Sequence, residues 1–292
     1  MKARAVPLDK LGEICNEDWV DQSRRPFADG STAWVPVREN EPFDRDLPEK
    51  SPYRGRGFFI VGSVAVIHGK KPGRDEIEAI VSFRNPDGIL WIRAIHDITR
   101  TPHTEVLWGD VGEVEHHENG YSYIFDPRTV MFSQGNRIEK MRMARLVGQS
   151  EKPERVADMF AGIGYFSVPM AGCGAQVHAM EINPVAFGYL QRTIERNGLS
   201  ERITASLGDC RVLLTGTYDR VVMGHFDAIT MLPSALGHAG PGTTIHVHSI
   251  GPVEDRIRET VEGSGFSATT SVHRVKKYSP HLWHVVQDVT LS

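Results

Sequence analysis

The chain has 292 residues, 40% apolar and 24% charged, which is typical of a soluble protein with enough material for two domains. No apolar run approaches the roughly 18 residues of a membrane helix, and Pro7, Asp9 and Lys10 interrupt any secretion signal. The net charge of −4 excludes a strongly basic chain but allows a local RNA-binding surface. The three cysteines lie far apart without metal-ligand spacing, so we expect a cytoplasmic protein without a metal site.

The first 129 residues divide into two segments that differ in polarity and in the spacing of apolar residues. Residues 1–55 are polar and repeatedly interrupted by proline, which predicts an irregular N-terminal arm with one short helix near Leu8–Val20. Residues 56–129 contain short strand-like runs at 58–66, 90–94, 106–108 and 121–125, and a segment at 76–83 that suits a helix or a strand. These runs predict a small mixed α+β domain, which we expect to face RNA.

Residues 130–292 alternate regularly between helix-like and strand-like segments. Helices are predicted over 135–146, 165–171, 184–197 and 253–262, and strands over 156–159, 176–180, 203–206, 220–223, 244–248, 268–275 and 283–290. Such alternation predicts a doubly wound α/β domain with a mostly parallel sheet, and the last two strands fit an antiparallel edge.

A glycine-containing turn follows the first strand of this domain. The strand ends in Asp158, and Phe160-Ala161-Gly162-Ile163-Gly164 leads into a helix. Glycines allow the backbone to approach a ligand closely, and the helix N-terminus faces that ligand. The third glycine of the dinucleotide motif is replaced by Ser167, so a nicotinamide-dependent dehydrogenase is a distant alternative. A tight turn without any ligand also fits this segment when it is considered alone.

Carboxylates follow the next two strands. Glu181 ends the second strand, where it can accept hydrogen bonds from both ribose hydroxyls of a nucleoside. Asp209 follows the third strand, where it can accept from an adenine amine while the Cys210 amide donates to a ring nitrogen. Either carboxylate alone also fits a solvated loop. Their order at successive strand ends predicts a nucleoside-binding site.

Together these motifs resemble the class I S-adenosylmethionine-dependent transferases. More narrowly, residues 95–289 resemble the family of the tRNA guanine-37 N1-methyltransferases and the tRNA wybutosine-synthesising aminocarboxypropyltransferases. The segments that carry the resemblance include the glycine turn, Arg100-Thr101-Pro102, His117-Glu118-Asn119-Gly120, Met131-Phe132-Ser133, Glu181-Ile182-Asn183-Pro184 and Val275-Lys276-Lys277-Tyr278-Ser279-Pro280. The resemblance implies a class I methyltransferase (Rossmann-like) fold for residues 130–292, S-adenosylmethionine as cofactor and tRNA as partner. The sequence itself gives no sign of an obligate protein partner.

The two branches of this family differ at the end of the fourth strand. The methylating branch has Asn-Leu-Pro or a close variant there, whereas this chain has Met223-Gly224-His225, which resembles the aminocarboxypropyl branch. That likeness implies transfer of the 3-amino-3-carboxypropyl group to 4-demethylwyosine at position 37 of tRNA-Phe, with release of methylthioadenosine. Methylation of guanine-37 N1 is the alternative, and a non-catalytic S-adenosylmethionine-binding RNA module is a further one.

The resemblance also implies roles for residues before the sheet. Ser133 and Lys140 match cofactor-contacting positions of the family, and Arg137 lies one helical turn before Lys140, where it can share or replace the contact with the methionine carboxylate. A solvated basic helix face is the plain alternative. The predicted cofactor-binding set is Ser133, Arg137, Lys140, Asp158, Phe160, Gly162, Gly164, Glu181, Asp209, Cys210 and Gly224.

His225 is the catalytic candidate, which we expect to contact the acceptor base or accept a proton. An anticodon-loop base is unpaired, so it can be splayed out and stacked on aromatic side chains. Basic segments that suit contact with that loop, or ordinary solvated surface, are Arg24-Arg25, Lys70-Lys71 and 273–278.

Overall fold

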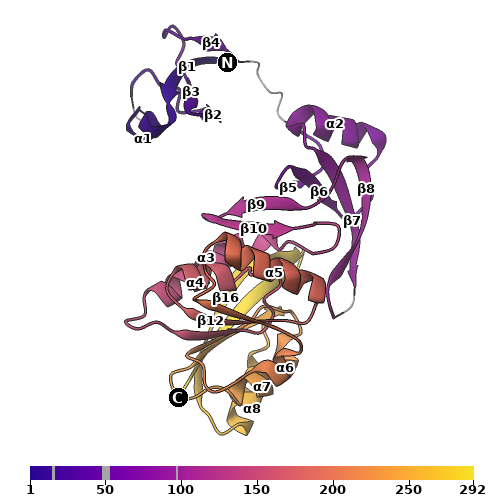
Figure 1. Cartoon of the computed structure of the whole chain (residues 1–292), viewed down its shortest axis with the longest axis vertical. Helices are drawn as coiled ribbons and strands as arrows, with labels where there is room; N and C mark the ends of the chain where they lie inside the picture. The colour runs from indigo at the N-terminus through magenta and orange to yellow at the C-terminus, as the bar shows by residue number, and fades with distance from the viewer. Residues whose placement is uncertain (15–16, 48–52, 97) are drawn as a thin grey trace. The chain divides into compact units, whose positions relative to one another are not determined.

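The computed structural model describes residues 1–14, 17–47, 53–96 and 98–292, so Cys15 lies outside the described residues. The chain separates into two compact units, Met1–Gly55 and Arg56–Ser292, and each is considered by itself (Figure 1). No helix of the described residues is long and apolar enough to cross a membrane.

The first unit contains an antiparallel sheet and not the irregular arm that the sequence predicts. Its strand order is β2 (Phe27–Asp29), β3 (Thr32–Pro36), β1 (Lys2–Pro7) and β4 (Arg45–Asp46), and the helical part is limited to η1 (Leu8–Lys10) and α1 (Leu11–Ile14). Pro7 and Pro36 are the last residues of their strands, where a missing backbone donor costs little. A small core of Val6, Val20, Ala33 and Val35 holds this sheet.

The second unit begins with a four-stranded sheet of order β5 (Phe59–Val61), β6 (Val64–His68), β7 (Gly88–His96) and β8 (Thr101–Gly109). Strands β6 and β7 are parallel, so the chain must cross over between them. Helix α2 (Arg74–Arg84) makes that crossover. Residues 76–83, for which the sequence allowed a helix or a strand, are therefore helical. The start of the helix is stabilised by the Gly73 amide, which donates to Glu76 at 2.9 Å.

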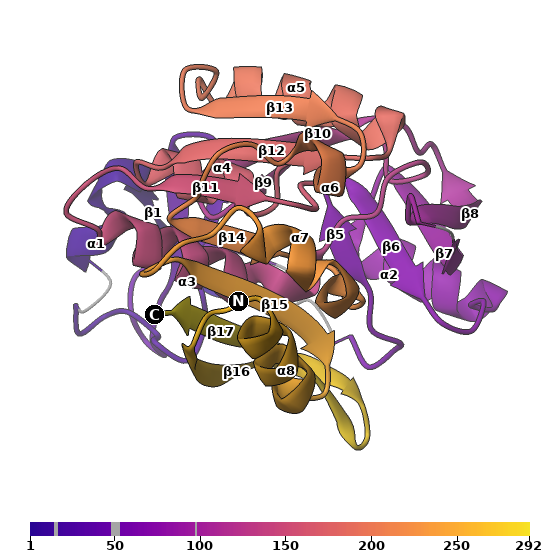
Figure 2. The same ribbon diagram turned by 90° about the horizontal axis from the view of Figure 1, so that it is seen from below.

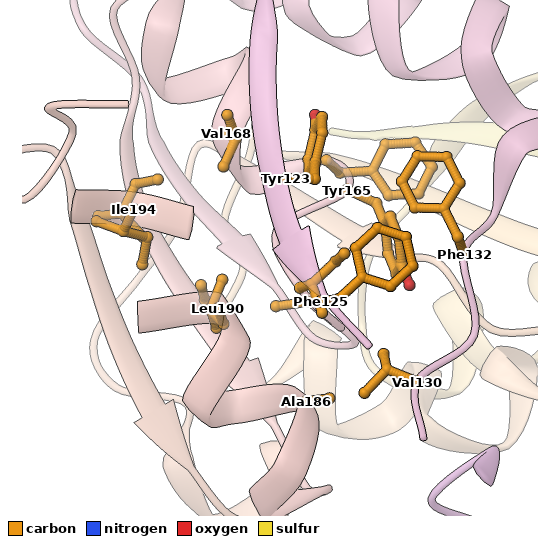
Figure 3. Close-up of a cluster of buried hydrophobic side chains, with 14 of the residues drawn as sticks. Tyr123, Phe125, Val130, Phe132, Tyr165, Val168, Ala186, Leu190 and Ile194 are labelled. Atoms are coloured by element: carbon orange, nitrogen blue, oxygen red, sulfur yellow. The ribbon is translucent and has the colours of Figure 1, made fainter. Parts of the chain in front are cut away.

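A separate hairpin, β9 (Val114–Glu118) and β10 (Tyr121–Phe125), packs against the large domain. Figure 3 shows Tyr123 and Phe125 between Leu190 and Ile194 on one side and Phe132 on the other. These side chains belong to one hydrophobic cluster that also includes Val64 of strand β6. The structure therefore joins residues 56–129 and 130–292 through a shared core, whereas the sequence places a domain boundary between them.

The large sheet has seven strands in the order β13 (Ile203–Leu207), β12 (Gln176–Glu181), β11 (Arg155–Asp158), β14 (Arg220–Met223), β15 (Thr244–Ile250), β17 (Leu282–Leu291) and β16 (Ala268–Ser279). The first five strands are parallel, and β17 runs antiparallel to both of its neighbours. The doubly wound sheet and its antiparallel edge agree with the prediction.

Helices cover both faces of this sheet. One face carries α3 (Arg137–Gly148), α4 (Ser167–Gly172) and α5 (Pro184–Arg196), and the other carries α6 (Cys210–Leu213), α7 (Leu232–Leu236) and α8 (Glu254–Gly263) (Figures 1 and 2). The sequence did not predict α6 and α7. The start of α5 is fixed by the Asn183 side chain, which accepts a hydrogen bond from the Val185 amide at 2.9 Å, and by Pro184 in the first turn.

A buried ion pair connects the hairpin to α3. Lys140 is fully buried and donates to Glu118 at 2.7 Å. The ammonium lies 4.6 Å from the centre of the Phe132 ring and 5.2 Å from that of Tyr165. Burial lowers the pKa of Lys140, while the charge of Glu118 and its hydrogen bond act in the opposite direction. Each charge therefore depends on the other in a site that water does not reach.

We expect Lys140→Met to lower the free energy of unfolding by about 3–5 kcal/mol, because it leaves Glu118 buried without a partner. The double variant Lys140→Met/Glu118→Met should recover most of this loss. Arg258→Met, which removes an exposed ion pair with Asp255, should cost less than about 1 kcal/mol. Urea denaturation measures all three, and a double variant no more stable than Lys140→Met contradicts the expectation.

Candidate active site

A cavity of about 1080 Å³ lies at the carboxyl ends of the parallel strands. Gly162 after β11, Glu181 at the end of β12, Asp209 after β13 and Gly224 after β14 all line it. Neighbouring strands are about 4.8 Å apart, so these residues form a row along the sheet edge. Ligands of open α/β sheets bind at this edge.

The turn after β11 requires its two glycines. Gly162 and Gly164 have φ angles of 58° and 99°, which side-chain-bearing residues rarely adopt. A Cβ atom on Gly162 would collide with the Tyr165 ring, and one on Gly164 would lie 2.8 Å from Val168. Gly162 lines the cavity together with Phe160, whereas Gly164 shapes the turn from behind.

Asp158 supports the turn from inside the protein. It is fully buried and accepts hydrogen bonds from the Ser167 hydroxyl at 2.6 Å and the Phe160 amide at 3.4 Å. Burial raises the pKa of Asp158 to about 6. The side chain ties β11 to α4 and is not among the residues that line the cavity.

Glu181 connects β12 to the glycine turn. One carboxylate oxygen accepts from the Gly162 amide and the other from the Asn183 amide, each at 2.7 Å. Burial raises the pKa of Glu181 despite these hydrogen bonds. Each carboxylate oxygen has a second lone pair, so the side chain can also accept from a pair of ligand hydroxyls.

The end of β13 is less open to a ligand than the sequence predicts. Asp209 caps α6 through the Arg211 amide at 2.9 Å, and its two oxygens also accept from the Arg211 guanidinium. These hydrogen bonds lower the pKa of Asp209. Cys210 is buried as the first residue of α6, where backbone N–H groups lack helical acceptors, and burial raises its thiol pKa to about 11.

His225 faces the cavity after β14. Its ring stacks on Phe160 with centroids 5.4 Å apart. Burial, with a contribution from Arg100, lowers the pKa of His225, so the imidazole is neutral near pH 7. Nδ1 accepts a hydrogen bond from the Asp227 amide at 3.2 Å, so the proton of the neutral ring is on Nε2. In this tautomer Nε2 can donate a hydrogen bond to a ligand in the cavity.

The structure separates the three residues predicted to hold the methionine carboxylate. Ser133 lines the cavity. Arg137 is exposed and donates to Asn119 at 2.9 Å, and Lys140 is enclosed with Glu118. Neither of these two cations is among the lining residues.

Four other cations line the cavity, Arg93, Arg100, Arg211 and Lys276, and Arg211 already pairs with Asp209. Arg100 lies between β7 and β8, and Lys276 lies in β16. Both belong to segments that carry the family resemblance, and Lys276 also lies in the basic segment 273–278, but the sequence did not predict either as a cofactor contact. Phe226 and Tyr278 also line the cavity, with ring centroids 5.8 Å apart in an edge-to-face arrangement. Among the described residues, no group of three or more His, Cys, Asp or Glu side chains is arranged to hold a metal ion.

The sequence of this region also matches a known protein family. Residues 114–275 match the model of the TRM5/TYW2 methyltransferase domain, and the match begins at β9, the first strand of the hairpin that packs on the large domain. The chain belongs to this family. The resemblance identified from the sequence is thereby confirmed, as is the class I methyltransferase fold.

Individual relatives and solved structures agree. The tRNA(Phe) (4-demethylwyosine(37)-C(7)) aminocarboxypropyltransferase of Methanocaldococcus jannaschii is 34% identical over 80% of this chain and 97% of its own length. The structure of M. jannaschii TYW2 in complex with AdoMet covers 81% of this chain and 99% of its own, with 27% identity and a TM-score of 0.65. Trm5b from Pyrococcus abyssi covers 100% of both chains with 25% identity and a TM-score of 0.74.

The raised pKa of Asp158 predicts a pH dependence of stability. The folded state disfavours the carboxylate, so its contribution to stability is complete below about pH 4 and is lost as the pH rises through 6. Lowering the pH from 7 to 5 should therefore stabilise the wild type by about 1 kcal/mol relative to Asp158→Asn. Chemical denaturation at both pH values measures this difference. Asp255→Asn, which alters an exposed carboxylate, is the control and should respond to pH as the wild type does. Equal pH responses of the wild type and Asp158→Asn would refute the raised pKa of Asp158.

Proposed function

We propose that the chain transfers the 3-amino-3-carboxypropyl group of S-adenosylmethionine to 4-demethylwyosine at position 37 of tRNA-Phe and releases methylthioadenosine. The observation that carries the proposal is the end of β14, where Gly224, His225 and Phe226 line the cavity in place of the asparagine of the methylating branch. The M. jannaschii relative that bears this activity in its name aligns over nearly its whole length, which supports the same conclusion.

The residues at the strand ends fit the adenosyl part of the cofactor. Glu181 binds the ribose hydroxyls with the lone pairs that the Gly162 and Asn183 amides leave free. Asp209 and the Cys210 amide lie at the adenine end, and Phe160 and Gly162 form the floor between the ends. S-adenosylmethionine supplies electrophilic carbons next to a sulfonium leaving group, so the chain's main task is to position the acceptor and one of these carbons.

The acceptor side of the cavity suits an extruded base. Phe226 and Tyr278 provide aromatic faces, and His225 donates a hydrogen bond through Nε2. tRNA contacts extend to the basic surface of the β16–β17 hairpin, where Arg274 and Lys277 are exposed. The Lys70-Lys71 segment is a weaker candidate, because Lys71 already pairs with Glu105 at 2.5 Å.

N1-methylation of guanine-37 is the second candidate function. One observation favours it, namely that the matching family model describes a methyltransferase domain. The decisive experiment incubates the full chain with S-adenosylmethionine and tRNA-Phe that carries either guanosine or 4-demethylwyosine at position 37. Mass spectrometry of the nucleosides should show gain of one aminocarboxypropyl group on 4-demethylwyosine only, together with methylthioadenosine. A methyl group on guanosine, with S-adenosylhomocysteine, overturns the proposal, and no product with either tRNA favours a non-catalytic binding module.

We expect Glu181→Ala to weaken S-adenosylmethionine binding by about 10- to 100-fold, because hydrogen bonds to a charged group are lost. Glu181→Gln should lie between this variant and the wild type, since the amide keeps one acceptor for the glycine turn. Glu201→Ala, at an exposed position before β13, is the matched control. Isothermal titration calorimetry gives the dissociation constants, and an unchanged constant for Glu181→Ala refutes the ribose contact.

A further inference from the structure

Two cations from distant parts of the chain face the same cavity. Arg100 precedes β8 and Lys276 lies near the end of β16, and both line the site. They are close enough for the charge of Arg100 to lower the pKa of Lys276, in addition to the larger effect of burial. Among the described residues, neither forms an ion pair with a carboxylate. Two like charges in a partly desolvated cavity repel each other unless an anion lies between them.

Arg100 is held in a conformation that has a cost. Its φ angle of 50° is in the left-handed region, which is unusual for a residue with a side chain. The guanidinium lies 5.7 Å from the centre of the Phe226 ring and donates to the Met131 sulfur, at 3.6 Å. Its Nε atom is buried and has no hydrogen-bond partner among the residues that the structure describes. Strained backbone and an unsatisfied buried donor at a cavity wall are features of ligand-binding positions.

Lys276 extends along the segment that contains Ser133. A Cβ atom on Gly135 would lie 2.6 Å from the Lys276 ammonium, so the glycine provides the space that this side chain occupies. Lys276 is half-buried, whereas its neighbour Lys277 is exposed. The two lysines therefore differ in setting although they are adjacent in sequence.

The position of the pair along the sheet edge indicates which ligand group it meets. The proposed adenine contacts lie after β13, and three strand spacings, roughly 14 Å, separate them from the end of β14. Arg100 contacts Phe226 after β14, and Phe226 in turn contacts Tyr278, two residues beyond Lys276. The cations thus lie at the opposite end of the cavity from the adenine, where an extended S-adenosylmethionine has its methionine part.

We propose that Arg100 and Lys276 together bind the carboxylate of the 3-amino-3-carboxypropyl group. The inference rests on the proposed function only for the identity of the ligand. The guanidinium offers a planar fork and the ammonium a point charge, and a carboxylate satisfies both. A tRNA phosphate fits less well, because the pair is recessed in the cavity while exposed cations such as Arg274 and Lys277 are available at the surface.

This placement has a consequence for the reaction. The carboxylate belongs to the group that is transferred, and the two cations lie beside Phe226 and Tyr278, where the acceptor ring stacks. Anchoring the carboxylate there directs the aminocarboxypropyl arm, and with it the γ-carbon, toward the acceptor. Arg100 and Lys276 are thus positioning residues that favour one of the electrophilic carbons.

The test compares ligands with and without the carboxylate. Calorimetry on the full chain gives dissociation constants of S-adenosylmethionine, decarboxylated S-adenosylmethionine and methylthioadenosine for wild type, Arg100→Gln, Lys276→Met and the control Lys277→Met. We expect Arg100→Gln and Lys276→Met each to weaken S-adenosylmethionine by about 10- to 100-fold and to leave methylthioadenosine unchanged. We expect the wild type to prefer S-adenosylmethionine over its decarboxylated form. In Arg100→Gln and Lys276→Met this preference should be smaller by the same factor. Lys277→Met should bind all three ligands as the wild type does, and Arg100→Lys should recover part of the loss.

Several outcomes overturn the inference. Equal losses for S-adenosylmethionine and methylthioadenosine indicate a collapsed cavity, and unchanged S-adenosylmethionine binding with a raised KM for tRNA assigns the pair to RNA. The proposed function fails separately, because a wild type that methylates guanosine contradicts the function while the ligand comparison still reports on the carboxylate.

Discussion

The buried Lys140–Glu118 ion pair fixes the wall on which the rest of the site depends. It joins α3 to the β9–β10 hairpin at 2.7 Å inside a shell of aromatic rings. One of these rings belongs to Tyr165, whose hydroxyl donates to the carbonyl of Met131 and so holds the segment that leads to Ser133. Because an unpaired charge at this depth would be costly, α3, the hairpin and the cavity wall form one cooperative unit.

The same pair also decides which cations are available to a ligand. An ammonium enclosed with a carboxylate has its charge satisfied, so Lys140 acts on the cavity only through the aromatic rings that it orders. Arg137, one turn earlier, points to Asn119 at the surface. Of the cations that line the cavity, Arg211 pairs with Asp209 and Arg93 is exposed. Arg100 and Lys276 come from the turn before β8 and from β16, outside the parallel part of the sheet. Anchoring of the adenosyl part and of the methionine arm is thus assigned to different parts of the fold.

The predictable features of this protein are those that depend on local pattern. The alternation of apolar runs predicts the parallel strands, and the glycine turn with Glu181 predicts the edge of the sheet where the cavity lies. The sheet of residues 1–55 escapes such reasoning, because its strand β1 pairs with β3 and β4, from Pro7 with Thr32 to Lys2 with Asp46, far apart in the sequence. The short helices α6 and α7 are equally hard to predict, since they contain too few residues to show a helical period.

The individual site residues show the same limit more sharply. A lysine on an amphipathic helix has the same sequence signature whether it faces a ligand or a buried glutamate, and only the fold brings Glu118 to Lys140. Arg100 has no periodicity that marks it, because its role follows from a left-handed backbone conformation in a turn and from Phe226, which is distant in sequence. Long-range contacts therefore determine which cation binds the ligand, while local sequence determines only that a cation is present.

If the sheet edge binds only the adenosyl part of the cofactor, the methionine part can rotate about its bonds to the sulfonium sulfur. On the proposed anchoring, the carbon that reacts is set by the cations at the far end of the cavity and not by the glycine turn. With this anchoring, a cation in another wall of the same cavity would hold the carboxylate elsewhere and so present a different carbon without any change to the sheet. In this chain the charge of Lys140 is paired with that of Glu118 in the core. Arg100, with its left-handed backbone, lines the cavity, so the proposed attraction on the carboxylate acts from the acceptor side.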